Sequence, residues 1–192
     1  MLYISLNIYL KVRQTGGVLT YFYALPIRLE AYGKLRFEYY DAIPIEKRHL
    51  TIVYLGAVRK NVALIDLSPA IGSLKAFKLY FKGVIPFPSA SSPRYLVAPV
   101  VRGVEKLSEL RKAIIEYMSK YGIKTKDKYA DFRPHVSLAR LPIKPDLSIH
   151  RYVSRVVKQF KNIRDEAVVD KVCLYRAEGD KYRIVASYSL SL

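Results

Sequence analysis

Two short stretches of this chain repeat one pattern of residue types: a histidine, an apolar residue, a hydroxyl residue and a second apolar residue. They are His49-Leu50-Thr51-Ile52 and His135-Val136-Ser137-Leu138, and the second histidine follows the first by 135 − 49 = 86 positions. Imidazole has an unperturbed pKa of about 6.5, so one neutral ring can remove a proton while a protonated ring donates one. The repeated pattern therefore predicts an acid–base pair accompanied by two hydroxyl groups.

Strand geometry explains how such a pattern can form a site. Residues two apart on a strand point to the same face and lie about 7 Å from each other. If both stretches are strands, His49 and Thr51 share a face, and His135 and Ser137 do the same. Packing of the two halves about a pseudo-twofold axis then lines one cleft with two imidazoles and two hydroxyls. This set suits cyclisation or hydrolysis of a phosphodiester, because hydroxyls can donate to phosphate oxygens where charge builds.

The elements that must position these groups are predicted from apolar periodicity and turn residues. We expect strands at Met1–Leu10, Val18–Ile27, Leu35–Tyr40, His49–Leu55 (closed by Gly56), Ala76–Val84, Arg94–Val101, His135–Leu141, Ala167–Arg176 and Tyr182–Ser189. We expect helices within Leu64–Leu74, over Val104–Tyr121 with Gly122 as its C-terminal cap, and over Ser148–Phe160. Loops are expected at Pro86–Pro93 and Lys124–Lys128.

The order of these elements favours the α+β class. Strands and helices alternate irregularly, and several neighbouring strands look like hairpins, including the last two around Glu178-Gly179-Asp180. This order favours antiparallel sheets over a parallel doubly wound sheet. We expect two similar lobes, each an antiparallel sheet flanked by helices, with the active-site cleft between them.

The charge of the chain is strongly positive. Its 192 residues include 33 Lys and Arg against 16 Asp and Glu, a formal net charge of +17. A field of this sign attracts polyanions, so nucleic acid is the expected partner, although a charged surface that serves only solubility is the alternative.

The cysteine count and the apolar runs indicate the cellular compartment, and the spacing of histidine and cysteine indicates whether a metal is bound. Cys173 is the only cysteine, which excludes an intrachain disulfide and favours a reducing compartment. No apolar run approaches the ~20 residues of a membrane span, and Met1–Leu10 lacks the flanks of a signal peptide. We therefore expect a cytoplasmic monomer. The three histidines and one cysteine lack ligand spacing, so we expect no metal and no cofactor, and we expect His150 to be solvated.

The sequence resembles the 2H phosphoesterase superfamily, in particular the LigT-like RNA 2′,3′-cyclic phosphodiesterases, also called 2′-5′ RNA ligases. The likeness covers about Leu19 to Leu190. It rests on the two motifs and on three stretches, His49–Gly56, Phe132–Arg140 and Arg94–Val101 followed by a helix. The double motif is specific, whereas each half alone is weak.

The resemblance implies a substrate and a role for each site residue. The implied substrate is RNA that ends in a 2′,3′-cyclic phosphate, opened to a 2′-phosphate, with ligation as the reverse reaction. His49 corresponds to the proton donor and His135 to the base that acts on water, while Thr51 and Ser137 hold phosphate oxygens. Arg140 corresponds to an arginine that contacts phosphate.

Several further residues are candidate contacts for RNA. Strict alternation puts Arg140 on the wrong strand face, so a bulge or a strand end must re-aim it, and a surface charge is the other reading. Arg133 and the basic loop can hold an RNA backbone. Tyr129 or Phe132 can stack on a base, although core packing suits Phe132 better.

The chain departs from the family pattern in three places. Ser137 replaces the commoner threonine, the interval between the first strand and His49 is short, and residues 1–17 extend beyond the family core. We therefore expect an N-terminal extension at 1–17 and a single bilobal domain at 18–192.

Three alternative functions remain open. The chain can be a non-catalytic RNA-binding protein that uses the same basic cleft, or a 2H enzyme that acts on a small cyclic nucleotide. It can also be a CRISPR-type repeat endoribonuclease. Those enzymes typically carry a glycine-rich loop near the C-terminus, whereas here Gly179 is the only glycine after Gly122.

Overall fold

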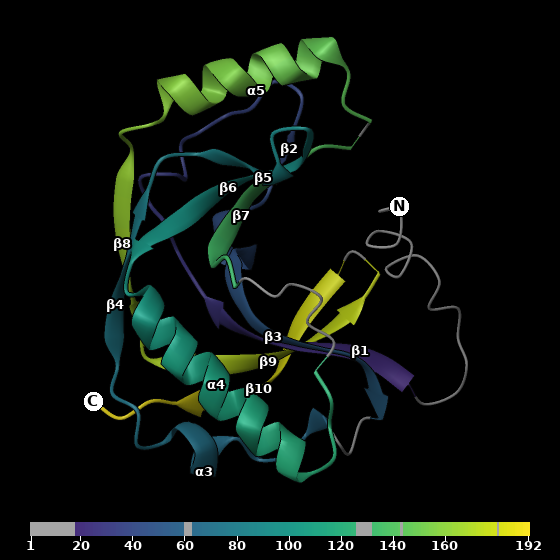
Figure 1. Ribbon diagram of the computed structural model, residues 1–192, viewed down its shortest axis with the longest axis vertical. Coiled ribbons are helices and arrows are strands. Elements are labelled where there is room, and N and C mark those ends of the chain that lie inside the picture. The colour runs from purple at the N-terminus through teal and green to yellow at the C-terminus, as the bar shows by residue number, and fades with distance from the viewer. Residues whose placement is uncertain (1–17, 60–62, 126–131, 143, 180) are drawn as a thin grey trace.

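The computed structural model of the chain describes residues 18–59, 63–125, 132–142, 144–179 and 181–192 (Figure 1). The expected extension at 1–17, the strand expected at Met1–Leu10 and the residue Tyr129 lie outside the described residues. The described chain forms two antiparallel sheets, one of four strands and one of six. The predicted α+β class with antiparallel sheets is confirmed.

The four-stranded sheet carries the first motif. Its strand order is β10 (Lys181–Ser189), β9 (Lys171–Glu178), β1 (Val18–Pro26) and β3 (His49–Arg59), so β3 lies at an edge. Helix α4 (Val104–Lys120) packs against β3 and against the short helix α3 (Ser68–Ile71). The 3-10 turn η1 (Ile45–Lys47) leads into β3.

The six-stranded sheet carries the second motif. Its main strand order is β2 (Asp41–Ala42), β7 (His135–Arg140), β6 (Ser92–Arg102), β4 (Phe77–Lys82) and β8 (Arg164–Val169), and β5 (Ile85–Ser89) pairs with β6. Helix α5 (Leu147–Gln159) contacts β5 and lies at the opposite end of the molecule from α3 (Figure 1).

One hydrophobic core joins the two sheets. Buried residues from both motif strands, including Leu50 and Leu138, belong to the same cluster as Leu110 and Ile114 of α4. A second, smaller cluster contains Phe22, Ala24, Cys173, Tyr175 and Ala177, with Tyr54 packed against it. Burial therefore anchors both motif strands and leaves their other side for the chemistry.

Two glycines with positive φ were expected to end elements, and only one of them does. Gly122 (φ 71°) ends α4 as predicted, and the Ile123 amide donates to the Met118 carbonyl at 3.2 Å, as in a Schellman motif. Gly56 (φ 74°) does not close the first motif strand, because β3 continues to Arg59 past a register shift at this glycine. Glycine tolerates this backbone conformation, so the strand bends instead of stopping.

The loop expected at Pro86–Pro93 is mostly strand. β5 pairs with β6 from Ile85↔Val97 to Ser89↔Ser92. Proline lacks an amide donor but is tolerated on a strand that has a partner on one side only, and β5 pairs only with β6 among the described strands.

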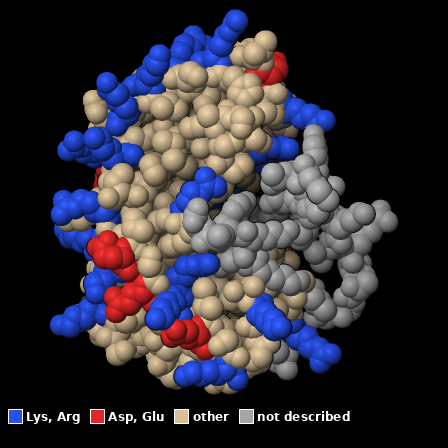
Figure 2. Space-filling view, viewed as in Figure 1, with Lys and Arg blue, Asp and Glu red and all other residues tan. Residues whose placement is uncertain are grey.

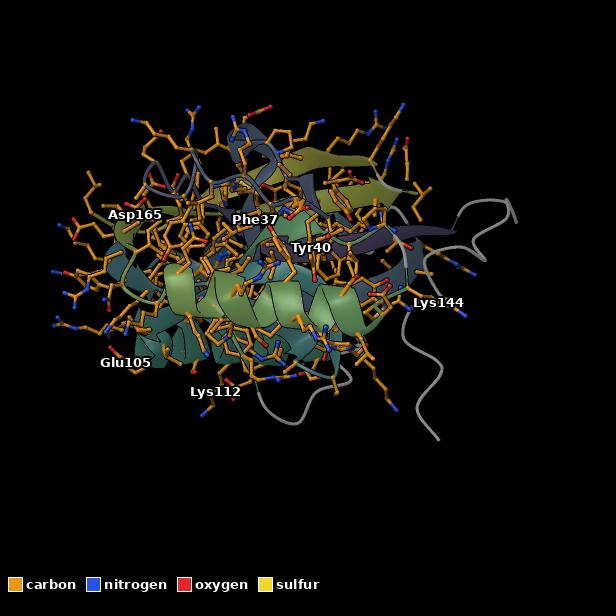
Figure 3. All side chains as sticks on the ribbon, turned by 90° about the horizontal axis from the view of Figure 1, so that it is seen from above. Phe37, Tyr40, Glu105, Lys112, Lys144 and Asp165 are labelled. Atoms are coloured by element: carbon orange, nitrogen blue, oxygen red, sulfur yellow. The ribbon has the colours of Figure 1, made fainter. Side chains whose placement is uncertain are left out.

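Two predicted strands are wrong. Leu35–Tyr40 is irregular with a turn near its end, and Phe37 and Tyr40, three positions apart, are both buried beside α5 (Figure 3). The strand expected at Ala167–Arg176 is two strands, because the chain leaves the six-stranded sheet after Val169 and enters the four-stranded sheet at Lys171. Apolar residues continue on both sides of this junction, so the pattern shows no clear break there.

Candidate active site

The two motif strands come together although they belong to different sheets. β3 and β7 contact each other directly, and each begins at its motif histidine. His49 and His135 are close enough that the charge of His49 lowers the pKa of His135. The structure thus brings together the two histidines that the sequence singled out.

Each histidine is held by the same hydrogen bond. The Nδ1 atom of His49 lies 3.0 Å from the carbonyl oxygen of Lys47, and that of His135 lies 2.8 Å from the carbonyl oxygen of Arg133. A carbonyl only accepts, so Nδ1 carries the proton in both neutral rings. The Nε2 atom of each ring is then the acceptor when the ring is neutral and a donor when it is protonated.

Burial favours the neutral form of both rings. The pKa of His49 is lowered by burial, against a smaller opposing effect of its bond to Lys47. The pKa of His135 is lowered by burial first, and further by the charges of Arg133 and His49. Because each charge lowers the affinity of the other ring for a proton, the pair favours one protonated and one neutral imidazole over two protonated ones.

Aromatic rings surround the two histidines unequally. The His49 ring lies 5.3 Å from Phe22, 5.2 Å from Tyr175 and 5.5 Å from Tyr182, measured between ring centroids. The His135 ring lies 4.0 Å from Phe87, at an interplanar angle of 33°. These rings cover part of each histidine, and this partial burial is the main cause of the lowered pKa values.

Both motif strands carry a β-bulge at the same position. The pairing with β1 passes from Thr51 to Val53, and the pairing with β6 passes from Ser137 to Ala139. Each motif therefore has one extra residue, its second apolar residue, directly after the hydroxyl. As a result, two consecutive residues are buried in each strand before the surface is reached again.

Each bulge also decides which way the residue after the two buried positions points. This residue is Tyr54 in β3 and Arg140 in β7. Arg140 is exposed at the end of β7 and pairs with Tyr95 and Asp41. The predicted role of Arg140 in phosphate binding required a bulge to turn its side chain to the other strand face, and the register shift in β7 is such a bulge. The role itself stays a prediction. Tyr54 takes the same position in the first motif, is partly buried and hydrogen bonds with Thr20.

The hydroxyl residues lie where strand alternation puts them. Thr51 is exposed and Ser137 is partly buried, whereas the residues on either side of each are buried. Thr51 pairs with Ala24 and Ser137 with Val97, so small or apolar residues lie across from both hydroxyls.

The other predicted contacts are placed differently. The Arg133 side chain donates to the Pro88 carbonyl at 3.2 Å and stacks on Phe87 at 5.1 Å. Phe132 packs against the core, as its alternative reading expected. His150, expected to be solvated, retains part of its exposed surface, and its Nδ1 lies 3.1 Å from the Ala90 carbonyl oxygen.

Sequence reasoning missed the aromatic residues beside His49. Phe22, Tyr175 and Tyr182 come from three other strands, and each is unremarkable alone in a chain with 17 tyrosines. These residues could have been found from the pairing of Phe22 with Tyr175, but that pairing can be predicted only if β1 is known to pair with β9.

Two further kinds of feature are absent from the described residues. No three His, Cys, Asp or Glu side chains there gather into a group that can hold a metal ion. None of the helices in the described ranges has the length and apolar character to cross a membrane.

Comparison with known proteins identifies the family. A family model described as the 2′-5′ RNA ligase superfamily matches residues 26–181, a span that contains both histidine motifs. This chain belongs to that superfamily. The predicted resemblance to LigT-like proteins is therefore confirmed.

Two curated proteins named RNA 2′,3′-cyclic phosphodiesterase are similar to this superfamily member. One, from Archaeoglobus fulgidus, is 32% identical over 101 residues, which is 52% of this chain and about half (55%) of the relative. The other, from Aquifex aeolicus, is 25% identical over 150 residues, or 74% of this chain and 77% of the relative.

Solved structures show the same fold at lower identity. TT0787 of Thermus thermophilus has a TM-score of 0.64 at 21% identity, covering 89% of this chain and 97% of that one. E. coli LigT complexed with 3′-AMP has a TM-score of 0.63 at 17% identity, covering 91% and 99%.

Proposed function

We propose that this chain is an RNA 2′,3′-cyclic phosphodiesterase that opens a terminal cyclic phosphate to a 2′-phosphate, using two histidines and no metal. The observation that carries the proposal is the matched pair of rings on contacting strands, each with Nδ1 bound to a backbone carbonyl and Nε2 left for chemistry. The family and the names of both curated relatives support this activity.

The proposed reaction transfers one proton at each ring. Neutral His135 accepts a proton from water as the water oxygen forms a bond to phosphorus. Protonated His49 gives a proton to O3′ as the P–O3′ bond breaks, leaving a 3′-hydroxyl and a 2′-phosphate. Proton exchange with solvent restores the starting forms. When the 5′-hydroxyl of a second RNA takes the place of the water, the same two proton transfers form a P–O5′ bond and break the P–O3′ bond, so 2′-5′ ligation requires no additional residue.

The groups around the phosphate complete the proposal. Thr51 and Ser137 donate hydrogen bonds to the non-bridging oxygens, where negative charge increases in the transition state. Arg140 contacts the phosphate from the end of β7. Arg133, the basic segment 124–128 and Tyr129 contact the RNA chain.

We further propose that residues 18–192 form one bilobal domain with an extension at 1–17, acting as a monomer in the cytoplasm. RNA is the favoured substrate because the net charge of +17 attracts a polyanion. The rival substrate is a small cyclic nucleotide, and the solved complex of E. coli LigT with 3′-AMP contains a single, non-cyclic nucleotide.

Product analysis on a short RNA that ends in a 2′,3′-cyclic phosphate tests the function. His49→Ala and His135→Ala should each lower turnover by about 10²- to 10⁴-fold, since each removes one proton-transfer group. RNA affinity should change little, because cationic contacts elsewhere supply most of it. His150→Ala is the matched control and should retain turnover.

Three outcomes contradict parts of the proposal. Near-normal turnover in either His49→Ala or His135→Ala refutes the acid–base pair. Binding of the cyclic-phosphate RNA by the wild type without opening it supports a non-catalytic RNA-binding protein instead. Loss of turnover in EDTA that one divalent metal restores refutes metal-free hydrolysis.

A further inference from the structure

Helix α5 and the turn after it carry only positive formal charge. Residues 147–164 include Arg151, Arg155, Lys158, Lys161 and Arg164, and no Asp or Glu. All five residues are exposed, and no ion pair between described residues involves any of them. Lys and Arg side chains project along the upper edge of the molecule in Figure 2, where Figure 1 places α5. This end of the molecule therefore presents uncompensated positive charge.

Three of these cations share one side of the helix. Arg151, Arg155 and Lys158 are spaced i, i+4 and i+7, so their side chains follow each other along about 10 Å of the helix. The buried residues of α5 lie on the opposite side: Ile149, Tyr152, Val153 and Val156. In Figure 3 α5 lies in front of the core, so the three cations face outward. We call these three residues the α5 stripe.

Helix α4 shows a different arrangement of charge. Its exposed cations are accompanied by acids, and Lys106 pairs with Glu109 at 2.9 Å and Lys112 with Glu116 at 3.8 Å. The partners in each pair lie one turn apart, a spacing that stabilises a helix. A helix of this protein thus meets solvent with nearly balanced charge, so solvation alone does not require the excess on α5.

The α5 stripe is unfavourable for the helix that carries it. Like charges three and four positions apart repel each other and slightly destabilise a helix. The helix dipole favours Lys158 in the last turn but not Arg151 in the N-terminal half. Helix stability therefore does not account for the stripe, whereas an anionic partner does, because it neutralises all three charges at once.

The stripe belongs to the lobe that carries the second motif. Helix α5 begins at Leu147, 147 − 140 = 7 positions after Arg140 at the end of β7. In its first turn, the Nδ1 atom of His150 lies 3.1 Å from the carbonyl oxygen of Ala90, between β5 and β6. The stripe faces away from the core that anchors both motif strands. A mononucleotide held at the two histidines therefore does not reach it, whereas a longer RNA can.

We propose that the α5 stripe binds the phosphate backbone of an RNA whose 3′ end lies at the two histidines. The inference rests on the proposed function for that placement of the RNA end. Cations at regular intervals fit a polymer whose charges recur, and contacts with phosphates position a nucleic acid without reading its bases. Lys161 and Arg164 continue the surface past the end of the helix. The stripe thus makes polymeric RNA the preferred ligand over a small cyclic nucleotide.

A charge-neutralising variant of the stripe tests the proposal against a matched variant of α4. The α5 variant combines Arg151→Gln, Arg155→Gln and Lys158→Gln. The α4 variant combines Lys106→Gln, Lys112→Gln and Lys120→Gln. Each variant lowers the net charge of +17 by three, so both change the total charge equally. The binding probes are a single-stranded RNA of about twenty nucleotides and a trinucleotide, both ending in a 2′-phosphate and measured by fluorescence anisotropy.

Only the α5 variant should strongly weaken binding of the long RNA, by at least about tenfold at roughly 0.1 M salt. The slope of log Kd against log salt concentration should fall by about two, because each lost contact with a single strand removes about 0.7. The trinucleotide should respond equally little to both variants. With the corresponding cyclic phosphates as substrates, KM for the long RNA should rise while kcat is retained, because the reacting groups are untouched.

Lysine acetylation of the wild type provides a measurement that needs no variant. The long RNA should protect Lys158 and Lys161 from a small acetylating reagent, whereas the trinucleotide should not. Lys112 on α4 is also exposed and should stay reactive with either ligand. Mass spectrometry of the digested protein measures each lysine. Equal reactivity of Lys158 with and without the long RNA overturns the proposal.

The other outcomes separate this proposal from its rivals. Equal losses of RNA affinity in the α5 and α4 variants overturn it, since total charge alone then governs binding. Unchanged RNA binding together with lost binding to phosphatidylglycerol vesicles in the α5 variant also overturns it and assigns the stripe to a membrane surface. If the wild type opens no cyclic phosphate, the proposed function fails, while the binding comparison still decides whether the stripe binds RNA.

Discussion

The hydrogen bond between each histidine and the carbonyl two residues before it fixes the chemistry that the ring can perform. The acceptors belong to Lys47 and Arg133, but they are backbone atoms, so any residue at these positions supplies the same bond. A side-chain carboxylate in their place adds a negative charge that raises the pKa of the ring. The neutral acceptor leaves burial as the main influence, and burial lowers the pKa of both rings.

Exchange of the two hydroxyl residues tests their proposed role. Thr51→Ser and Ser137→Thr should retain turnover, because each keeps a donor at the same position on the strand. Thr51→Val and Ser137→Ala should each lose about 10²-fold in turnover, the typical effect of removing one donor to a charged transition state. Steady-state kinetics on cyclic-phosphate RNA measures this. Equal activity of Ser137→Ala and Ser137→Thr contradicts the role.

The lowered pKa values also predict how stability depends on pH. Both histidines have a native pKa below the ordinary 6.5, so between those values the unfolded chain binds more protons than the native one. The free energy of unfolding should therefore fall as pH drops below about 6.5 and level off once the native rings are protonated. Above that pH the two rings contribute no slope.

Urea unfolding at closely spaced pH values checks this slope. His49→Gln and His135→Gln remove a titrating ring, so each should lose stability less steeply than the wild type over that range. A wild-type slope that persists unchanged in both variants means that other groups cause it.

At this scale the sequence predicted the pair and its hydroxyls but not their surroundings. The spacing of two between His49 and Thr51 is enough to put them on one face, because alternation within a strand is a local property. Tyr182 and Phe22 reach His49 from other strands. Their approach depends on strand order, which residue spacing does not encode.

Among the elements, the two motif strands are alike beyond their sequence pattern. Both carry a bulge directly after the hydroxyl, and both return to the surface at the same step, with Tyr54 in one and Arg140 in the other. A shared irregularity of this kind supports a common origin of the two strands more strongly than a shared run of apolar residues, since bulges are retained as structural features. At this equivalent position, β3 carries the phenol of Tyr54 and β7 carries the guanidinium of Arg140.

The segment between β2 and β3 connects the two motifs. The buried guanidinium of Arg48 donates to the Ile43 carbonyl at 3.0 Å, and the Ile43 amide donates to the Leu138 carbonyl at 2.8 Å. Leu138 is the bulged residue of the second motif, and Arg48 directly precedes His49. The chain of bonds therefore fixes the first motif relative to the second.

Arg48→Met should test this connection. It leaves the Ile43 carbonyl without its donor, so we expect a loss of about 1–3 kcal/mol in the free energy of unfolding, although removal of a buried charge offsets part of it. Turnover should fall more than RNA affinity, because the spacing of the histidines changes. Arg151→Met, on the exposed side of α5, should stay within about 0.5 kcal/mol of the wild type. Unchanged stability and turnover in Arg48→Met exclude a positioning role.

Sequence patterns located the long elements better than the short ones. Helix α4 was predicted to within one residue, because its apolar period extends over several turns and Gly122 marks its end. β5 was missed since its prolines are typical of loops, and only its place beside β6 makes them tolerable. The break between β8 and β9 was missed for a similar reason, as it depends on which sheet each strand joins.

For the whole molecule, charge is the property with the longest reach. Lys and Arg side chains are spread over the face shown in Figure 2, with Asp and Glu at few points. The net charge of +17 sets a field that acts before any specific contact forms. Under the proposed function, recruitment of RNA and opening of its end should therefore be separable.

Salt should separate them in practice. If binding releases counterions from several phosphates, the dissociation constant for an RNA oligomer should weaken at least about tenfold between roughly 50 and 200 mM salt. A single cyclic nucleotide has fewer charges, so its dissociation constant should change much less. Titrations of both ligands in the same buffers measure this. A dissociation constant for RNA that does not change with salt concentration indicates an enzyme for small nucleotides.

The matched anchoring of the two rings has a consequence for regiochemistry. Each ring offers the same nitrogen, and under the proposed mechanism His49 gives its proton to whichever ribose oxygen lies against it. A ribose with O3′ at His49 yields the 2′-phosphate, whereas the same ribose turned over places O2′ there and yields the 3′-isomer. Which isomer forms is therefore decided by the surfaces that orient the nucleotide, and a change of isomer requires no change in either histidine.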